Sequence, residues 1–416
     1  MERLRPGARD GERPPRPPRQ RRAFSTIGGP VELGGDADAA RTLGRLYGVE
    51  PALERALTHG FHSYAGRMHP SIARGAVEAF TAPGDAVVDP FCGSGTVLVE
   101  AMGLGRRALG VDASPLGVAI ARARTTLLGE AGRERLVSEA AQIAEQSGER
   151  ARKRKRPEVP RWARREIERF HPHVLFELLG LRELVMALPD DDVGRAVRLC
   201  LSSLLVKFMK AGPTAPRDGA AKRIARGVPS RMLADRAAEL ARGLAALERR
   251  TPPGTPAAQI WEGDARELPI EAASAALVIS SPPYAGTYDY AAIHDARFLW
   301  LGLSETKFRR MQLGARANQV GDVSGDAWRA QQARFMAEIA RVLRPGGRAL
   351  LVVGDGVVDG RAENAPDGIA AAGAPLGLEP IARASQARPL HDRRLATIFA
   401  GQPRREHLLL LEKRAR

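Results

Sequence analysis

The chain has 416 residues, of which 44% are hydrophobic and 5% aromatic, and its formal net charge is +16. This length accommodates one large α/β domain with an insertion, or two domains. Its two cysteines, Cys92 and Cys200, are too few and too far apart for a disulfide framework or a zinc site, as expected in a reducing cytoplasm. The sequence has neither a long apolar run nor an apolar segment in its Arg/Pro-rich N-terminus, which argues against membrane spanning and secretion. The positive charge favours a polyanionic partner, although a compositional bias toward Ala, Arg, Gly and Pro is the alternative explanation.

The N-terminal region predicts a tail followed by helices. Residues 1–35 are rich in Pro, Arg and Gly and cannot bury a core, which indicates a disordered basic tail; a weak nonspecific DNA-binding arm is the alternative. Residues 39–57 have helical apolar spacing and predict a helix packed outside a sheet. A further helix is expected from Pro70 to Phe80, because proline is favoured at the first helical position.

Residues 85–114 carry the pattern that organises the chain. An apolar run at 86–88 predicts a buried parallel strand, which leads through Asp89 and a Gly-Ser-Gly turn into a helix, and a second run at 108–111 ends in Asp112. This order of elements, a strand, a glycine turn, a helix and a second strand that ends in an acid, is typical of the half-fold that binds an adenosine-containing cofactor. Glycines let the backbone approach a ligand, the helix N-terminus offers free N–H donors, and a carboxylate can accept from both ribose hydroxyls.

The glycine turn excludes two other nucleotide sites. A dinucleotide fingerprint would carry a third glycine where this chain has Leu98, and the lysine of a P-loop is absent. A turn with a purely structural role is the remaining alternative, and Asp112 favours the adenosine site over it.

A long helical stretch follows the predicted helix at 115–128, where a third strand would be expected. Helices are predicted at 174–188, at 193–209 and at 230–249, the last of them capped by Ser230. The stretch also carries a cluster of basic residues, which would contact phosphates in a DNA-gripping element; a solvated helix face with a polar connector is the alternative. The members of this basic cluster are Lys207, Lys210, Arg217, Lys222, Arg223 and Arg226.

The α/β pattern resumes with a strand at 259–261, followed by Asp264. A carboxylate at this strand end can accept from an adenine amino group, and an Asx turn or N-cap is the alternative. The buried strand predicted at 275–280 delivers Ser281-Pro-Pro-Tyr284 to the same sheet edge. Tyr288 or Tyr290 could flank a bound base, or close a small core. A helix at 327–343, a strand at 348–354, a helix at 366–378 and strands at 395–399 and 407–411 complete the prediction.

Two of these motifs carry a resemblance to a known family. DPFCGSGT at 89–96, followed far downstream by Ser281-Pro-Pro-Tyr284, resembles the S-adenosylmethionine-dependent amino-methyltransferases that modify exocyclic amines of DNA bases. HGFHSYAGRMHPSIAR at 59–74 is similar to the segment that precedes the glycine loop in one bacterial branch of that family. The resemblance covers roughly residues 55–130 and 258–415.

The resemblance implies a fold and a domain organisation. The fold would be an α/β, Rossmann-like methyltransferase fold with a seven-stranded, mostly parallel sheet and a large helical insertion. Residues 36–130 and 256–416 would form the catalytic domain. Residues 131–255 would form the insertion, which would serve as a DNA-recognition element, a lid or an oligomerisation element.

The resemblance also implies a cofactor and a site. S-adenosylmethionine would be the cofactor, and no metal is expected. Its binding residues would be Met68, His69, Asp89, Pro90, Phe91, Gly93, Ser94, Gly95, Thr96, Asp112 and Asp264. The catalytic residues would be Ser281, Pro282, Pro283 and Tyr284. Independently of the resemblance, the charge of the basic cluster and the aromatic ring of Tyr288 make them the candidate nucleic-acid-binding residues.

The Ser-Pro-Pro-Tyr sequence suits methyl transfer to an amine. The lone pair of a base amine is delocalised into the ring, so the nitrogen needs acceptors for both N–H bonds before it can attack. The Ser281 hydroxyl and the Pro282 carbonyl can supply them, and Pro283 has no N–H to compete for that carbonyl. Tyr284 offers a flat face on which an extruded base can stack.

The expected function is that of a cytoplasmic, site-specific DNA methyltransferase of the restriction–modification type. Serine at position 281 resembles the cytosine-N4 enzymes, whereas aspartate or asparagine is usual for adenine-N6. An RNA base amino-methyltransferase is the first alternative, which the lack of a recognisable extra RNA-binding domain disfavours. A nucleic-acid-binding protein with a vestigial cofactor site is the second.

Overall fold

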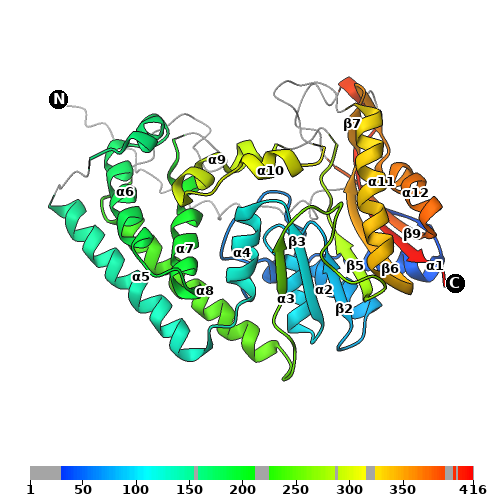
Figure 1. The fold of residues 1–416 in the computed structure, drawn as a ribbon, viewed down its shortest axis with the longest axis horizontal. Helices are drawn as coiled ribbons and strands as arrows, with labels where there is room; N and C mark the ends of the chain where they lie inside the picture. The colour runs from blue at the N-terminus through cyan, green and yellow to red at the C-terminus, as the bar shows by residue number, and fades with distance from the viewer. Residues whose placement is uncertain are drawn as a thin grey trace, which may run out of the picture.

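The computed structural model describes residues 30–153, 158–210, 224–285, 289–314, 324–388, 397–399 and 402–415. Figure 1 shows a central sheet with α11 and α12 on one side of the view and the helices α5 to α8 on the other. The helices are α1 (Ala37–Leu46), α2 (Pro70–Phe80), α3 (Thr96–Gly103), α4 (Pro115–Thr125), α5 (Gly129–Arg152), α6 (Pro172–Met186), α7 (Asp192–Phe208), α8 (Val228–Arg250), α9 (Tyr290–Leu301), α10 (Thr306–Met311), α11 (Gly325–Val342) and α12 (Ala365–Gly373). The strands are β1 (Val31–Gly35), β2 (Ala86–Asp89), β3 (Arg107–Asp112), β4 (Gln259–Glu262), β5 (Ala275–Ser280), β6 (Leu343–Gly354), β7 (Gly356–Val358), β8 (Arg361–Glu363), β9 (Leu378–Ala387) and β10 (Arg405–Lys413).

Within the described residues, eight strands form one sheet in the order β1-β9-β10-β6-β5-β2-β3-β4. The strands β4, β3, β2, β5 and β6 run parallel to one another, whereas β10 pairs antiparallel with both β6 and β9, and β1 pairs antiparallel with β9. The carboxyl ends of the five parallel strands therefore meet at one edge of the sheet. This architecture confirms the predicted α/β, Rossmann-like fold.

Both faces of the sheet are buried, which explains why its strands read as continuous apolar runs. Val87 and Leu277 face one hydrophobic core, which α2 and α3 cover, while Val88 and Val278 face the other, which α11 covers. Alternate residues of one strand thus enter different cores, as the two-residue period of a strand requires. Among the residues that the structure describes, no helix is long and apolar enough to cross a membrane.

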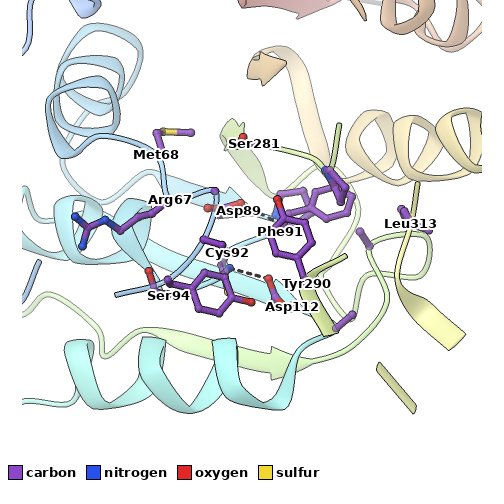
Figure 2. Close-up of a pocket in the computed structure, with 18 of the residues that line it drawn as sticks. Arg67, Met68, Asp89, Phe91, Cys92, Ser94, Asp112, Ser281, Tyr290 and Leu313 are labelled. Atoms are coloured by element: carbon purple, nitrogen blue, oxygen red, sulfur yellow. Dashed lines mark hydrogen bonds between the residues drawn. The ribbon is translucent and has the colours of Figure 1, made fainter. Parts of the chain in front are cut away.

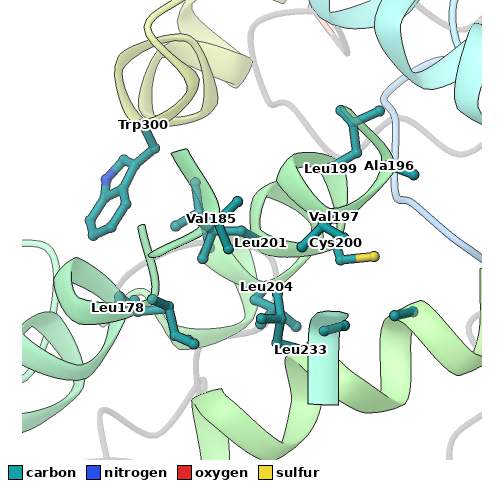
Figure 3. Packing of buried hydrophobic residues seen from close by; sticks show 14 of the residues in the cluster. Leu178, Val185, Ala196, Val197, Leu199, Cys200, Leu201, Leu204, Leu233 and Trp300 are labelled. Carbon is teal, nitrogen blue, oxygen red and sulfur yellow. The ribbon is translucent and has the colours of Figure 1, made fainter. Parts of the chain in front are cut away.

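The helices α5 to α8, the predicted insertion, share a core with α4 and α9. Leu178 and Val185 on α6 and Leu204 on α7 belong to the same hydrophobic cluster as Ile120 on α4 and Trp300 on α9 (Figure 3). Figure 1 shows α9 and α10 running from the insertion across the top of the molecule toward the sheet. The insertion therefore packs directly against the helix that approaches the carboxyl edge of the sheet.

Polar contacts fix the same junction. The indole N–H of Trp300 donates to Oε2 of Glu166 over 2.9 Å, and the Trp300 carbonyl accepts from Arg182 over 2.7 Å. Arg169 of the insertion forms two hydrogen bonds with the carboxylate of Asp295 on α9, at 3.1 and 2.6 Å. Charge-assisted, two-point contacts of this kind fix orientation as well as distance.

The sheet has one strand more than the seven expected. Residues 31–35, which the sequence grouped with the basic tail, form β1 and pair with β9, with Leu33 opposite Ala384. An edge strand needs hydrogen-bond partners on one side only, so it can form with little buried apolar surface, and Leu33 remains 49% exposed. Residues 1–29 lie outside the described part of the chain.

The predicted closing strand at 395–399 is wrong for the part that the structure describes. Thr397 and Ile398 are helical, and β9 at 378–387 pairs with β10 instead. β9 escaped prediction because Pro380 interrupts its pattern, and the pairing with β10 indeed shifts register beside that proline.

Two helix boundaries also differ from the prediction. α1 ends at Leu46, and only Pro51–Arg55 continue, as a 3-10 turn, because Gly48 and Pro51 disfavour an unbroken helix. Ser230 is not a helix cap: α8 begins at Val228, and both the N–H and the hydroxyl of Ser230 donate to Oε1 of Glu177 on α6. The N-terminus of α8 is therefore capped by a carboxylate from a neighbouring helix and not by a side chain of its own first turn.

Truncation of Trp300 tests whether the shared core supports the fold. Trp300→Ala removes a fully buried indole and its hydrogen bond, so we expect the free energy of unfolding to fall by about 3–5 kcal/mol. Ile293→Ala on the same helix, where the side chain is 46% exposed, should change it by less than about 0.5 kcal/mol. Denaturant unfolding followed by circular dichroism measures both variants, and equal stabilities would contradict a shared core.

Candidate active site

The glycine loop between β2 and α3 has the conformation that its sequence predicts. Gly93 and Gly95 have φ angles of +48° and +77°, in the left-handed region that glycine tolerates. A Cβ on Gly95 would lie 2.9 Å from the Cβ of Ala121, so this glycine also lets α4 approach the loop. The N–H of Gly95 donates to the Cys92 carbonyl over 2.7 Å and closes the turn. The first-turn N–H groups of α3, which have no partner within the helix, follow directly.

Asp112 ends β3 beside this loop. Its Oδ2 accepts from the N–H of Gly93 over 2.7 Å, and its Oδ1 accepts from the N–H of Ser114 over 2.8 Å. Burial raises the pKa of Asp112 to about 6, although both backbone hydrogen bonds act against the rise. Each oxygen keeps a further acceptor position, so the carboxylate can still receive two hydroxyl groups.

A side-chain hydrogen bond joins the two sequence motifs. β5 pairs with β2 in parallel, with Val87 opposite Leu277, and the hydroxyl of Ser280 donates to Oδ1 of Asp89 over 2.6 Å. Burial raises the pKa of Asp89 to about 7. Ser281, the next residue along, consequently enters the same pocket as the glycine loop.

The pocket at this sheet edge has an empty volume of about 820 Å³, which includes the open solvent at its mouth. Figure 2 shows Asp89 between Ser281 and Asp112, with Met68 and Leu313 at opposite sides. Eleven of the predicted site residues line this pocket: Met68, Asp89, Pro90, Phe91, Gly93, Ser94, Thr96, Asp112, Asp264, Ser281 and Pro283.

Asp264 forms the Asx turn that was the alternative to an adenine contact, and the adenine contact itself stays a prediction. Its Oδ1 accepts from the N–H of Arg266 over 2.9 Å in an Asx turn, and the Arg266 guanidinium also bonds both carboxylate oxygens at 2.9 and 2.6 Å. Burial alone would raise the pKa of Asp264, but these hydrogen bonds outweigh it and hold the pKa below its usual value. The ionised carboxylate also lines the pocket and retains acceptor positions.

Four predicted residues lie outside the pocket lining. Gly95 faces α4, and His69 caps α2 by accepting at Nδ1 from the N–H of Ser71 over 3.1 Å. Pro282 and Tyr284 line a smaller neighbouring pocket. The Tyr284 ring lies against Gly354, where a Cβ would come within 2.5 Å of it. The stacking role assigned to Tyr284 stays a prediction.

Only part of the predicted nucleic-acid cluster can be located. Lys207 is half-buried at the end of α7, while Lys210 and Arg226 are exposed on either side of the interval 211–223. Arg217, Lys222, Arg223 and Tyr288 lie outside the described residues.

The structure adds pocket residues that the sequence analysis did not assign. Tyr64 lines the pocket, and its ring stacks on His294 with centroids 4.7 Å apart. Tyr290, one of the two tyrosines weighed for the base, lines it as well. Residues of α10 and the following turn close the other side: Phe308, Met311, Gln312 and Leu313. Tyr64 stands within the 59–74 motif, whereas the α10 wall has no sequence signal.

The donors and acceptors present fit S-adenosylmethionine. The lining has three acidic side chains: Asp112 and Asp264 offer acceptors to ribose hydroxyls and an adenine amino group, and together with Asp89 they give the pocket an acidic character that suits the positive charge of this cofactor. Among the described residues, the buried hydroxyl of Thr96 at the start of α3 has no hydrogen-bond partner. The described residues contain no group of three or more His, Cys, Asp or Glu side chains that could hold a metal ion.

The strand order and the pocket together form the half-site for an adenosine-containing cofactor, at the edge where parallel strands end. Residues 56–122 match the N6/N4 methyltransferase family model, described as DNA methylase. This match confirms, for that segment, the predicted resemblance to the DNA amino-methyltransferases.

Known proteins are similar to this chain over segments of comparable length. Type II methyltransferase M.MjaII of Methanocaldococcus jannaschii is 38% identical over 66 residues, which are 16% of this chain and 12% of that protein. Type II methyltransferase M.MvaI of Kocuria varians is 33% identical over 88 residues, which are 20% of this chain and 19% of that protein. The similarity thus spans less than a fifth of the length of either relative.

Similarity to solved structures is weak. TrmN from Thermus thermophilus aligns with a TM-score of 0.32 and 14% identity over 84% of this chain and 50% of that one. The rRNA methyltransferase aviRa from Streptomyces viridochromogenes aligns with a TM-score of 0.34 and 12% identity over 86% of this chain and 91% of that one. At these scores the alignments add nothing to the fold that the strand order already defines.

The buried Asp112 predicts a pH dependence of cofactor binding. Above a pH of about 6 the carboxylate is ionised and accepts from two hydroxyls, and below it the proton removes an acceptor. We expect the dissociation constant of S-adenosylmethionine to rise as the pH falls through about 6. Asp112→Asn should bind more weakly at neutral pH and lose this rise. Calorimetric titrations across the range measure it, and an unchanged profile in Asp112→Asn would contradict the assignment.

Proposed function

We propose that this protein is a DNA methyltransferase that transfers the methyl group of S-adenosylmethionine to an exocyclic base amine, with cytosine N4 as the favoured target. The main support is the shared pocket of Ser281 and the glycine loop, two motifs about 190 residues apart, held together by the Ser280–Asp89 hydrogen bond. The match of residues 56–122 to the DNA methylase family supports the DNA substrate. Serine at position 281 supports cytosine over adenine through the stated resemblance.

The chain's own residues account for the reaction by binding and orientation. The cofactor supplies a methyl group already activated by a positively charged sulfur. Asp112 and the glycine loop hold the adenosine part, and Ser281 accepts one N–H bond of the target amine through its hydroxyl oxygen. By the stated resemblance the Pro282 carbonyl, from the neighbouring pocket, would accept the other, so that the nitrogen lone pair is released from the ring. The nitrogen then bonds the methyl carbon as the carbon–sulfur bond breaks, S-adenosylhomocysteine leaves, and the surplus N–H proton passes to solvent. Alignment of two reactants in this manner is worth about 7–11 kcal/mol of the barrier.

The target base has to leave its duplex to reach this pocket, because its amine is engaged in pairing there. The pocket is open to solvent, and its wall includes Phe91 and Tyr290, which offer aromatic surface to a base. Extrusion of the base is part of the proposal.

The experiment that tests the function is nucleoside analysis. Purified protein is incubated with radiolabelled S-adenosylmethionine and either genomic DNA or total RNA, and the digested nucleosides are separated and identified by mass spectrometry. We expect N4-methylcytosine from DNA. N6-methyladenine would overturn the assignment of the base, methylation of RNA alone would overturn DNA, and cofactor binding without transfer to either would favour the vestigial-site alternative.

Removal of one hydroxyl separates chemistry from cofactor binding. Ser281→Ala should lower kcat by about 10- to 100-fold, the effect of one lost hydrogen bond in the transition state, and leave the affinity for S-adenosylmethionine unchanged. Ser274→Ala, at the opposite end of the same strand, is the matched control and should leave both unchanged. A Ser281→Ala enzyme with normal turnover and weakened cofactor binding would reverse the proposed roles.

We also propose that the helical insertion contacts DNA phosphates beside the pocket. Lys210 and Arg226 are exposed at the ends of α7 and α8, where backbone-contacting residues would be accessible to a duplex. The double variant Lys210→Ser/Arg226→Ser should weaken DNA binding on all sequences and reduce the slope of log affinity against log salt by about 2. Fluorescence anisotropy at several salt concentrations measures this slope. An unchanged slope would point to the lid or oligomerisation alternative for the insertion.

A further inference from the structure

A buried arginine lies directly beneath the glycine loop. Arg124, near the end of α4, is fully buried, and its guanidinium donates to the carbonyl of Ser94 over 2.5 Å and to the Ser94 hydroxyl over 3.0 Å. Its Nε donates to the Thr58 carbonyl over 3.1 Å. None of these partners is a carboxylate. The guanidinium therefore holds the backbone of the loop that forms the floor of the pocket.

The contact fixes one peptide of the loop in a particular orientation. The Ser94 carbonyl points at Arg124, away from the pocket, while the N–H of the same peptide closes the turn onto Cys92. A buried carbonyl without a donor is costly, so loss of Arg124 would favour another orientation of this peptide. The free N–H groups at the start of α3, which begins two residues later, would be displaced with it.

A chain of polar contacts, two hydrogen bonds and one ion pair, extends from Arg124 to the helical insertion. Its guanidinium also donates to Nδ1 of His59 over 2.6 Å, and Nε2 of His59 donates to Oε1 of Glu100 on α3 over 2.7 Å. Oε2 of Glu100 forms an ion pair with Arg250, in the last turn of α8, at 3.0 Å. His59 and Glu100 are fully buried.

Charge and tautomer are consistent along this chain. His59 accepts at Nδ1, so its proton resides on Nε2, and burial lowers its pKa to about 4, which keeps the ring neutral. Burial would raise the pKa of Glu100, but the hydrogen bond from His59 and the charge of Arg250 hold it below its usual value. Each group thus presents the donor or acceptor that its neighbour needs.

We propose that Arg124 is a positioning residue for the cofactor loop, and that Arg250 of the helical insertion supports it through Glu100 and His59. The insertion then contributes to the affinity for S-adenosylmethionine from outside the pocket, since none of Arg124, His59, Glu100 or Arg250 lines it. This inference rests on the proposed cofactor and assigns no chemistry to the four residues.

The direct test replaces the guanidinium. Arg124→Met should raise the dissociation constant of S-adenosylmethionine by about tenfold or more, since a hydrogen bond from a charged donor commonly has that effect on an equilibrium. KM for the cofactor should rise in parallel, while kcat at saturating cofactor and KM for DNA stay within about twofold of wild type. Arg124→Lys keeps the charge and one donor to Ser94, and should recover part of the loss.

The second test changes Arg250, the last residue in this series of contacts, where a substitution is less disruptive to folding than at the fully buried Arg124. Arg250→Met should raise the same dissociation constant by about threefold to tenfold, since it removes one ion pair from a coupled network. Arg249→Met is the matched control, because Arg249 is its exposed neighbour in the same helical turn and should have no effect. Thermal melting of each variant without ligand reports stability separately.

The outcomes separate this inference from the proposed function. Lower melting temperatures with unchanged cofactor affinity in both Arg124→Met and Arg250→Met would show a merely structural network and overturn the inference. An Arg124→Met protein that fails to fold leaves Arg250→Met against Arg249→Met as the deciding comparison. Wild-type protein that does not bind S-adenosylmethionine would instead overturn the proposed cofactor.

Discussion

The hydrogen bond between Ser280 and Asp89 is the contact on which the site depends. It joins the last residues of two adjacent parallel strands, β5 and β2, over 2.6 Å in a fully buried position. Because the strands are parallel, their next residues emerge at the same edge, and so the glycine loop and Ser281 face one cavity. A shift of register by one residue would turn Ser281 to the opposite face of the sheet. The pairing of Val87 with Leu277 prevents this shift, since each occupies the same core.

Much of the fold could be predicted because the buried strands and amphipathic helices carry strong local patterns. β2, β3 and β5 are short apolar runs that are buried on both faces, and α2 runs from Pro70 to Phe80 as predicted. The elements that were predicted wrongly depend on contacts with residues that are distant in the sequence. β1 forms because β9 offers it backbone partners, and the start of α8 is held by Glu177, a residue 50 positions away from Gly227. Contacts of this kind leave no periodicity to detect.

The candidate site also contains residues that could be predicted from the sequence and residues that could not. The residues at strand ends could be predicted, because a glycine turn and an acid at those positions have a direct chemical purpose, and Asp112 and Gly93 indeed contact each other. The opposite wall, formed by Phe308 and Leu313, could not, because these residues are ordinary apolar side chains whose position depends on how α9 and α10 cross the sheet edge. Tyr284 shows the converse: its motif was evident, yet its ring packs on Gly354, a close approach that no local pattern reveals.

The shared core of the insertion and α9 limits how the molecule can be divided. Trp300 and Asp295 on α9 bind Glu166 and Arg169 across the junction, and α9 carries Tyr290 into the pocket. A chimaera that exchanged α5 to α8 alone would leave these partners mismatched and expose the apolar face of α9 to water. The natural module for transplantation into another chain of this fold is therefore the insertion together with α9, even though the two are separated in sequence by β4 and β5.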